Sequence, residues 1–202
     1  MSQEPAYPFL IIKTKNMACT LSLGRKEPCK DSVGGIRAVY FADFGDLGAI
    51  TEADDVISAF GSNPDFYQYE VKGASSFTQN IQSNRENGTT AFEQVLELTL
   101  HKLSKEDHKE LKVLAFGRPH VLVEDYNGNV FVAGLEHGME VTGGTIVTGG
   151  AMGDLSGYTL TLTGMERRPA NFIAVTGAAP DAETDIAATT TTDPAIIKGT
   201  NS

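Results

Sequence analysis

The sequence predicts a mainly β protein, an antiparallel β-sandwich or barrel with one flanking α-helix and a long β-hairpin. Its 202 residues include 21 glycines and no tryptophan. β-branched and aromatic residues gather in short runs separated by Gly, Asn and Asp, which is typical of strands joined by turns. Only one segment carries a clear helix signal. We expect strands at Phe9–Lys13, Ile36–Phe41, Phe66–Lys72, Ser76–Gln82, Thr89–Leu100, His120–Glu124, Val130–Ala133, Met139–Val147, Gly157–Gly164 and Asn171–Val175.

Two turns between these strands are well marked. Asn127-Gly128 separates two short apolar runs, and a two-residue Asn-Gly loop supplies the positive φ angles that a tight hairpin requires. The polar segment Asn84–Gly88 separates two longer extended stretches. Residues 66–100 are therefore expected to form one long hairpin with a polar tip.

The single clear helix is predicted at residues 104–115. Ser104 is a suitable N-cap, and Asp107 stands where a capping box places its second member. Gly117 and Pro119 would end the helix. The segment Thr51–Phe60 is read as either a turn or two of helix or a loop.

Polar and apolar residues alternate along the predicted hairpin, so one of its faces is apolar and the other is wet. An isolated two-stranded ribbon is marginal and presents open hydrogen-bonding edges. If copies of the chain join such edges in a ring, the wet face lines a lumen. The alternative is an ordinary sandwich strand whose polar face meets solvent. The predicted lumen-lining residues are Glu70, Thr78, Asn80, Glu93, Glu97 and Thr99.

Residues 1–175 are interpreted as one β domain and residues 176–202 as an Ala/Thr-rich C-terminal arm. The arm has too little apolar content for a core of its own. It is either a disordered tail or an arm that orders on a neighbouring subunit, with Ile196 and Ile197 as an apolar anchor.

The formal net charge of −10 argues against tight binding to nucleic acid or to an anionic membrane. No apolar run approaches the roughly 20 residues that span a bilayer, and no signal peptide is recognisable. The spacing of Cys19 and Cys29 is not that of a zinc site, so they are either free thiols or one bridge.

Four segments resemble the tail-tube-like virion proteins of tailed bacteriophages, especially phages of Bacteroidetes hosts. The first, Phe77–Thr90 with Phe92-Glu93-Gln94 and Leu96–Leu100, resembles their long hairpin. The other three are Cys29–Ile36, Asp125–Asn129 and Thr148–Leu160. The resemblance covers residues 17–175, and its motifs are assembly patterns rather than catalytic signatures.

The resemblance implies a β-sandwich with one flanking helix that assembles into stacked sixfold rings, with an inner barrel built from the hairpins. It implies a structural role in the virion, assembly in the host cytoplasm, partners among copies of this chain and other tail proteins, and transient, non-specific passage of double-stranded DNA. Loops and terminal arms would join successive rings. By position, the hairpin tip consists of Asn84, Arg85, Glu86, Asn87 and Gly88. A terminator or adaptor of the tail is an alternative role with the same fold.

No catalytic, cofactor-binding or metal-binding residue is expected. The run Thr142–Asp154 is either a phosphate cradle or a glycine-rich β turn, and no lysine follows it. Neither the four histidines, His101, His108, His120 and His137, nor the acidic residues Asp43, Asp46, Glu52, Asp54 and Asp55 follow a metal-site pattern. The chain is not expected to be an enzyme.

The rival to a tail component is a monomeric β-sandwich binding module, for instance a binder of host-surface carbohydrate. Such a module would expose an aromatic platform. Its candidate residues are Tyr126, Phe131 and Tyr158.

Overall fold

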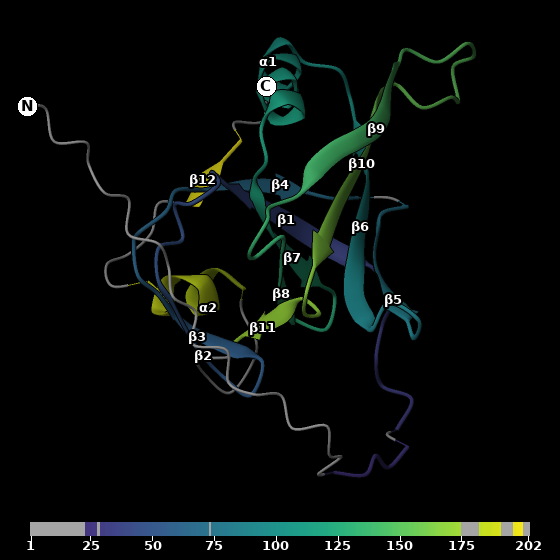
Figure 1. Ribbon diagram of the computed structural model, residues 1–202. Helices are drawn as coiled ribbons and strands as arrows, with labels where there is room; N and C mark the ends of the chain where they lie inside the picture. Colours follow the sequence, from purple (N-terminus) through teal and green to yellow (C-terminus); the bar gives the residue numbers. More distant parts are fainter. Residues whose placement is uncertain (1–22, 28, 73, 175–181, 191–195, 200–202) are drawn as a thin grey trace, which may run out of the picture. The chain divides into compact units, whose positions relative to one another are not determined.

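A computed structural model describes residues 23–27, 29–72, 74–174, 182–190 and 196–199 (Figure 1). The chain divides into two compact units, Met1–Ser32 and Val33–Ser202, and all described helices and strands belong to the second. In the first unit, Cys29 is an exposed free thiol. The strand expected at Phe9–Lys13 and the other cysteine, Cys19, lie outside the described residues.

The larger of two sheets has eight strands in the order β12-β4-β1-β7-β8-β11-β3-β2. It is mixed, because β12 runs parallel to β4 and β11 runs parallel to β3, while its other pairs are antiparallel. Its strands are β1 (Ile36–Ala42), β2 (Ile50–Ala53), β3 (Val56–Phe60), β4 (Phe66–Glu70), β7 (His120–Asp125), β8 (Val130–Ala133), β11 (Asn171–Ile173) and β12 (Ile196–Lys198).

The smaller sheet has four antiparallel strands in the order β5-β6-β10-β9. They are β5 (Ser76–Asn84), β6 (Thr89–His101), β9 (Glu140–Val147) and β10 (Gly157–Glu166). Neither sheet closes on itself within the described part of the chain. The mainly β class is therefore confirmed. The expected purely antiparallel arrangement is not, because the eight-stranded sheet contains two parallel strand pairs.

The expected hairpin over residues 66–100 is wrong in its first third. β4 belongs to the eight-stranded sheet and β5 to the four-stranded sheet, so only β5 and β6 form a hairpin. Val71, just after β4, is buried between the sheets. The alternation that continues through residues 66–82 reflects two half-buried strands in different sheets. Periodicity shows that a strand is half-buried but does not show to which sheet it belongs.

The segment Thr51–Phe60 is neither a helix nor a loop. It forms the hairpin of β2 and β3, with Asp54 and Asp55 in the turn at φ angles of 53° and 62°. Two successive left-handed residues are the geometry of a type I′ turn, and aspartate adopts this conformation more readily than most residues. The turn was missed because it lacks the usual glycine.

The turn at Asn127-Gly128 joins β7 to β8 as expected, but only Gly128 has a positive φ, of 81°. The Gly128 N–H donates to the Asp125 carbonyl at 3.2 Å, and the Asp125 N–H donates to the Asn129 carbonyl at 3.0 Å. The loop is therefore a longer turn closed by a left-handed glycine rather than a two-residue turn. The Asp125 carboxylate stabilises it by accepting from the Asn127 and Asn129 N–H groups, both at 2.8 Å.

The predicted helix is present as α1 (Lys105–Phe116). The Ser104 hydroxyl caps it by accepting from the Asp107 N–H at 2.9 Å, and Gly117 follows its last turn. A second, shorter helix, α2 (Ala182–Ala188), lies in the segment expected to be an arm. Its Ile186 is completely buried, so residues after 175 contribute to the core.

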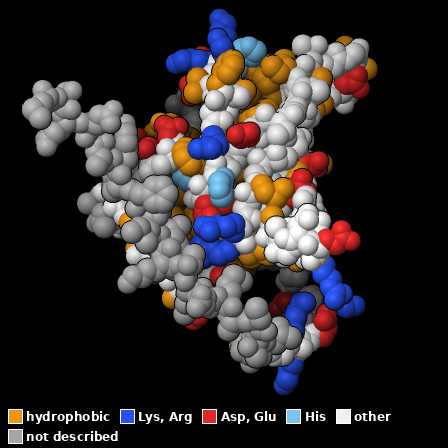
Figure 2. All heavy atoms as spheres, in the orientation of Figure 1, with side chains coloured by type: hydrophobic (Ala, Val, Ile, Leu, Met, Phe, Trp, Pro, Cys, Tyr) orange, Lys and Arg blue, Asp and Glu red, His pale blue; other side chains and the backbone are white. Residues whose placement is uncertain are grey.

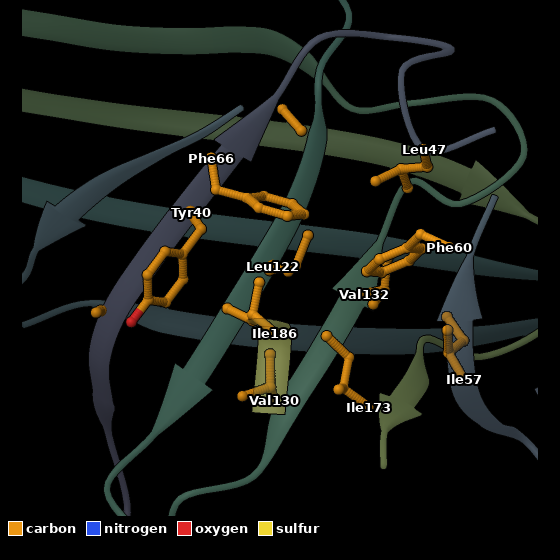
Figure 3. Close-up of a cluster of buried hydrophobic side chains, with 12 residues drawn as sticks. Tyr40, Leu47, Ile57, Phe60, Phe66, Leu122, Val130, Val132, Ile173 and Ile186 are labelled. Atoms are coloured by element: carbon orange, nitrogen blue, oxygen red, sulfur yellow. The ribbon is translucent and has the colours of Figure 1, made fainter. Parts of the chain in front are cut away.

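Apolar side chains form two cores, one on each face of the large sheet. The first lies between the two sheets and includes Val39, Val121, Leu96 and Leu162. The second lies on the opposite face, where Ile186 of α2 packs among the side chains labelled in Figure 3. They are Tyr40, Leu47, Ile57, Phe60, Phe66, Leu122, Val130, Val132 and Ile173.

Two buried or half-buried glutamines fix the small sheet to the rest of the fold. Gln94 Oε1 accepts the Gly134 N–H at 2.8 Å, and Gln79 Oε1 accepts the Ala170 N–H at 2.7 Å. The two glutamines lie opposite each other in the β5–β6 register. Because a lost bond would leave a buried amide unsatisfied, these contacts hold the hairpin in one position over the large sheet.

Candidate functional site

The face of the small sheet that points away from the large sheet is a continuous polar surface. The strand registers place its members opposite one another, for example Ser76 opposite Glu97 and Glu97 opposite Thr161. Their side chains are exposed or half-buried, and none is lysine or arginine. They are Ser76, Thr78, Asn80, Gln82, Ala91, Glu93, Val95, Glu97, Thr99, His101, Glu140, Thr145, Val147, Thr159, Thr161, Thr163 and Met165. We call this surface the outer face.

The outer face brings together five of the six residues predicted to line a lumen. They are Thr78, Asn80, Glu93, Glu97 and Thr99. The sixth, Glu70, is exposed on β4 of the large sheet and lies outside this surface. The sequence places it on the lumen face because residues 66–100 are expected to form one long hairpin, whereas β4 and β5 lie in different sheets.

Short polar contacts order the side chains of the outer face. Glu93 Oε2 accepts from Gln82 Nε2 at 3.0 Å and from Asn80 Nδ2 at 3.4 Å. The Thr145 and Thr159 hydroxyls lie 2.6 Å apart on neighbouring strands. Amide and hydroxyl groups therefore surround the carboxylates of this face, and its fixed charges, on Glu93, Glu97 and Glu140, are all negative.

The small sheet ends in two open edges. Within the described residues, β5 pairs with β6 alone and β9 pairs with β10 alone. Because the sheet has four antiparallel strands, β5 and β9 run in opposite directions. An edge strand presents unpaired N–H and C=O groups that can bind another strand. These two edges can bind each other in antiparallel fashion if they come from different copies.

Sequence comparison adds no relative. No family model, curated protein or solved structure matches this chain. The geometry and chemistry of the outer face and its edges are therefore the basis for a functional inference.

The hairpin tip closes as a polar turn that projects into solvent. Asn84 Oδ1 accepts the N–H groups of Glu86 at 2.9 Å and Asn87 at 3.1 Å, and Gly88 has a φ of 63°. All residues from Asn84 to Gly88 are exposed, including Arg85. The expected turn is thus present, and a contact of this tip with another ring stays a prediction.

Ile196 and Ile197, the predicted anchor of the arm, lie on β12 at the edge of the large sheet. They pair with Phe66 and Tyr67 of β4 in the same chain. Ile196 packs against the core, and Ile197 stays 41% exposed. Binding of this strand to a neighbouring subunit stays a prediction.

The glycine-rich run forms part of β9 and the turn that follows it. The Asp154 carboxylate accepts the N–H groups of Gly150 at 2.9 Å and Ala151 at 2.7 Å, and these bonds lower its pKa. The amides that a phosphate would need are thus already bound to a carboxylate of the chain. This geometry corresponds to the β-turn alternative.

His120 is buried, whereas the other three histidines are exposed. The Gly45 N–H donates to His120 Nε2 at 3.0 Å, so Nδ1 carries the proton and donates to the Gly134 carbonyl at 2.7 Å. Burial lowers the pKa of His120, because the charged form is poorly solvated there. The ring also stacks on Phe44. Its two hydrogen bonds and this ring contact indicate that His120 has a structural role.

Glu136, His137 and Glu166 bring their ligand atoms within 4.8 Å of one another. Glu166 Oε1 accepts the N–H groups of Glu136 and His137, and Glu166 Oε2 lies 3.2 Å from His137 Nδ1. Glu136 pairs with Arg167 at 2.8 Å. Hydrogen bonds and ion pairs thus account for this arrangement. Of the acidic residues noted in the sequence, Glu52 pairs with Arg168, and Asp54 and Asp55 form a turn.

The three aromatic candidates for a carbohydrate platform do not share a surface. Tyr158 is 1% exposed and donates its hydroxyl to the Ser104 carbonyl. Phe131 lies between Phe77 and Phe172 in a row of rings. Only Tyr126 is widely exposed. Among the described helices, none has the length and apolar character needed to cross a membrane.

Proposed function

We propose that this chain is a structural subunit of a bacteriophage tail tube. The observation that carries the proposal is the small sheet, whose open edges flank an outer face without lysine or arginine. In the proposed assembly, β9 of one copy pairs with β5 of the next, and the sheets join into a barrel with the outer face toward the lumen. The resemblance noted in the sequence supports the same arrangement.

The number of strands supports ring closure. An even, fully antiparallel sheet continues as antiparallel across a β9–β5 junction, so every junction in a ring can be identical. A repeated head-to-tail contact of this kind closes when the rotation per copy fits the circle. Six copies, the number that the resemblance implies, would supply roughly 24 strands, more than the 16–18 that leave an open aqueous channel in porins.

The offset between the edges supports a barrel rather than a flat extended sheet. Asn80, in the middle of β5, lies opposite Glu93. Gly143, near the middle of β9, lies opposite Thr161, which lies opposite Glu97. The edges are thus displaced by about four residues along β6. If β9 pairs centrally with the next β5, the strands tilt by about 35° from the barrel axis, near the roughly 35–45° of closed barrels.

The chemistry of the outer face supports passage of double-stranded DNA. Its fixed charges are carboxylates, and the rest is mostly threonine, serine and amide side chains. Phosphates bind proteins mainly through lysine and arginine, so a lumen of this composition repels DNA weakly and offers no cationic anchor. DNA would slide through such a lumen without being held.

Cysteine cross-linking across the proposed junction tests this function. The panel pairs Thr78→Cys or Asn80→Cys on β5 with Gly143→Cys or Thr145→Cys on β9, after Cys19 and Cys29 are replaced by serine. Within one chain these edges are separated by two strands, or roughly 14 Å, too far for a disulfide. We expect oxidation to yield disulfide-linked oligomers and negative-stain images to show rings or hollow rods.

The matched control pairs Thr78→Cys with Thr161→Cys on the inner strand β10, and it should give no linked oligomers. Single rings that never form rods would favour a terminator or adaptor. A chain that stays monomeric at all concentrations, with no pair cross-linked, would exclude the tube.

A further inference from the structure

The solvent-facing side of α1 carries a basic and apolar surface that nothing in the described chain covers. Lys105, Lys109, Lys112 and Phe116 are spaced by four, three and four residues and therefore share one side of the helix. All four are exposed, and Phe116 is 86% exposed. Lys109 also lies 3.9 Å from Glu110 on the neighbouring side of the helix, so Lys105 and Lys112 carry the positive charge of the stripe that has no such neighbour within 4 Å among the described residues. Val113 lies next to this stripe and is 61% exposed. Figure 2 shows basic side chains gathered at the top of the view, over α1, with hydrophobic side chains beside them.

This basic surface contrasts with the protein as a whole. The chain has a formal net charge of −10, and an acidic protein with a local lysine stripe favours an acidic partner. The opposite side of α1 packs on the fold through Leu111, which is buried. The lysines are thus not needed to attach the helix.

A complementary surface lies toward the opposite end of the small sheet. Asp54 and Asp55 are exposed in the β2–β3 turn, and the Asp55 carbonyl accepts the Phe172 N–H at 3.1 Å. Phe172 is 42% exposed and Ile81, near the hairpin tip, is 70% exposed. Arg168 lies close enough to interact with Asp55, but it is paired with Glu52. This end therefore combines carboxylates with exposed apolar side chains, as the α1 end combines lysines with Phe116 and Val113.

The two surfaces are separated along β6. α1 follows the end of β6 closely, whereas Ile81 pairs with Phe92 near its start. The strand has 13 residues and spans about 44 Å. In a barrel whose strands are tilted by about 35°, its two ends lie at opposite axial faces of a ring.

We propose that the lysine stripe of α1 binds the Asp54–Asp55 end of a second copy in the next ring, with Phe116 buried against its exposed apolar side chains. This inference rests on the proposed function, because it assigns the contact between rings. Such a contact is head-to-tail and does not close on itself, so it extends rings into a tube.

Charge reversal on one side tests the contact. Lys109→Glu with Lys112→Glu should leave rings intact and abolish rods in negative-stain images. Asp54→Asn with Asp55→Asn should do the same, and asparagine tolerates the positive φ angles of this turn. Lys26→Glu with Lys30→Glu is the control for the lysine variant, because it changes the net charge by the same amount at exposed residues of the first unit. It should leave rod length unchanged. Circular dichroism and thermal unfolding verify that each variant is folded.

Mixing the two sets of purified variant rings gives a sharper readout. Two junctions are possible between unlike rings. Only the one that joins the lysines of the aspartate variant to the aspartates of the lysine variant has opposite charges, so we expect pairs of rings and no rods. Rods of wild-type length from the lysine variant would overturn the inference while leaving the proposed function intact. Wild-type rings that never stack would also overturn it. Wild-type protein that forms no rings, together with cysteine pairs that give no linked oligomers, would remove the proposed function as well.

Discussion

The side-chain amide of Asn127 forms two hydrogen bonds with the backbone of Val33. Asn127 Oδ1 accepts the Val33 N–H and Asn127 Nδ2 donates to the Val33 carbonyl, both at 2.8 Å. The amide thus pairs with Val33 much as a strand neighbour would. It fixes the chain that leads into β1 to the β7–β8 turn, which lies 94 residues away in sequence.

Replacing Asn127 by alanine should remove both bonds and also the 3.2 Å bond from Asn127 Nδ2 to Asp125 Oδ2. We expect the fold to be destabilised by about 1–3 kcal/mol, since each hydrogen bond contributes about 0.5–1.5 kcal/mol. Urea denaturation measures this change, and hydrogen exchange should speed up around Val33. Asn87→Ala in the hairpin tip is the matched control, because Asn87 donates to Asn84 through its backbone N–H, which alanine keeps. Equal effects of the two substitutions would contradict a specific role for the Asn127 amide.

A buried tyrosine makes the stability sensitive to alkaline pH. Tyr40 donates its hydroxyl to Glu124 Oε2 at 2.9 Å, and burial together with this carboxylate raises its pKa. The unfolded chain loses the proton near pH 10 whereas the folded chain keeps it. The stabilisation is therefore complete below pH 10 and is lost as pH rises above it.

Tyr40→Phe should cost about 1–3 kcal/mol at neutral pH, because buried Glu124 loses a donor, and it should flatten the loss of stability above pH 10. Urea midpoints between pH 8 and pH 11 provide the measurement. Burial also raises the pKa of Tyr69, to about 12, so Tyr69→Phe should flatten the remaining slope. An unchanged alkaline slope in both variants would contradict this account.

His120 should make the fold sensitive to mild acid. Burial lowers the pKa of His120 in the folded chain. Below pH 6.5 the imidazole is therefore protonated in the unfolded chain but still neutral in the folded chain. Stability is therefore full above pH 6.5 and falls as pH decreases toward the folded-state pKa. His120→Gln should remove this part of the slope between pH 7 and pH 5, as read from urea midpoints. His108→Gln, on the exposed side of α1, serves as control and should leave the slope as it is.

Positive charge on the outer face should create a DNA-binding surface. Glu93→Lys with Glu97→Lys removes two of its carboxylates and adds two ammonium groups. We expect folding to change by no more than about 1 kcal/mol, and duplex DNA to be retained at low salt and released as salt rises. Gel shift and, in reassembled particles, slower DNA ejection are the measurements.

Glu70→Lys provides the control for this test, because Glu70 is exposed on β4 of the other sheet. One lysine there should leave DNA retention and ejection unaltered. Equal increases in DNA retention from Glu70→Lys and from the outer-face pair would show that the net charge of the protein, rather than a lining role of Glu93 and Glu97, governs the result.

Local signals in the sequence identified most elements of the fold. Alternation located β6, the Asn84–Gly88 turn separated it from β5, and Ser104 marked the start of α1. These features depend on residues close together in the chain, where periodicity and capping are decisive. The same alternation placed Glu93 and Glu97 on one face, which the β6–β10 register confirms.

The errors concern relationships between distant segments. Nothing in the alternation of residues 66–82 indicates that the chain changes sheets after Val71, because both strands are half-buried. The turn at Asp54-Asp55 lacks a glycine, and the buried Ile186 lies in a segment whose composition is that of a tail. Pairing of β11 beside β3, over a hundred residues apart, has no local signature.

The position of α2 also has a consequence for the order of events during synthesis. Ile186 fills the second core, and the Phe60 N–H donates to the Thr189 carbonyl, so this side of the large sheet is completed by residues translated after β1 to β11. A nascent chain that has emerged only as far as β11 would still expose apolar side chains from that sheet. Exposed apolar surface of this kind makes incompletely synthesised chains prone to aggregate.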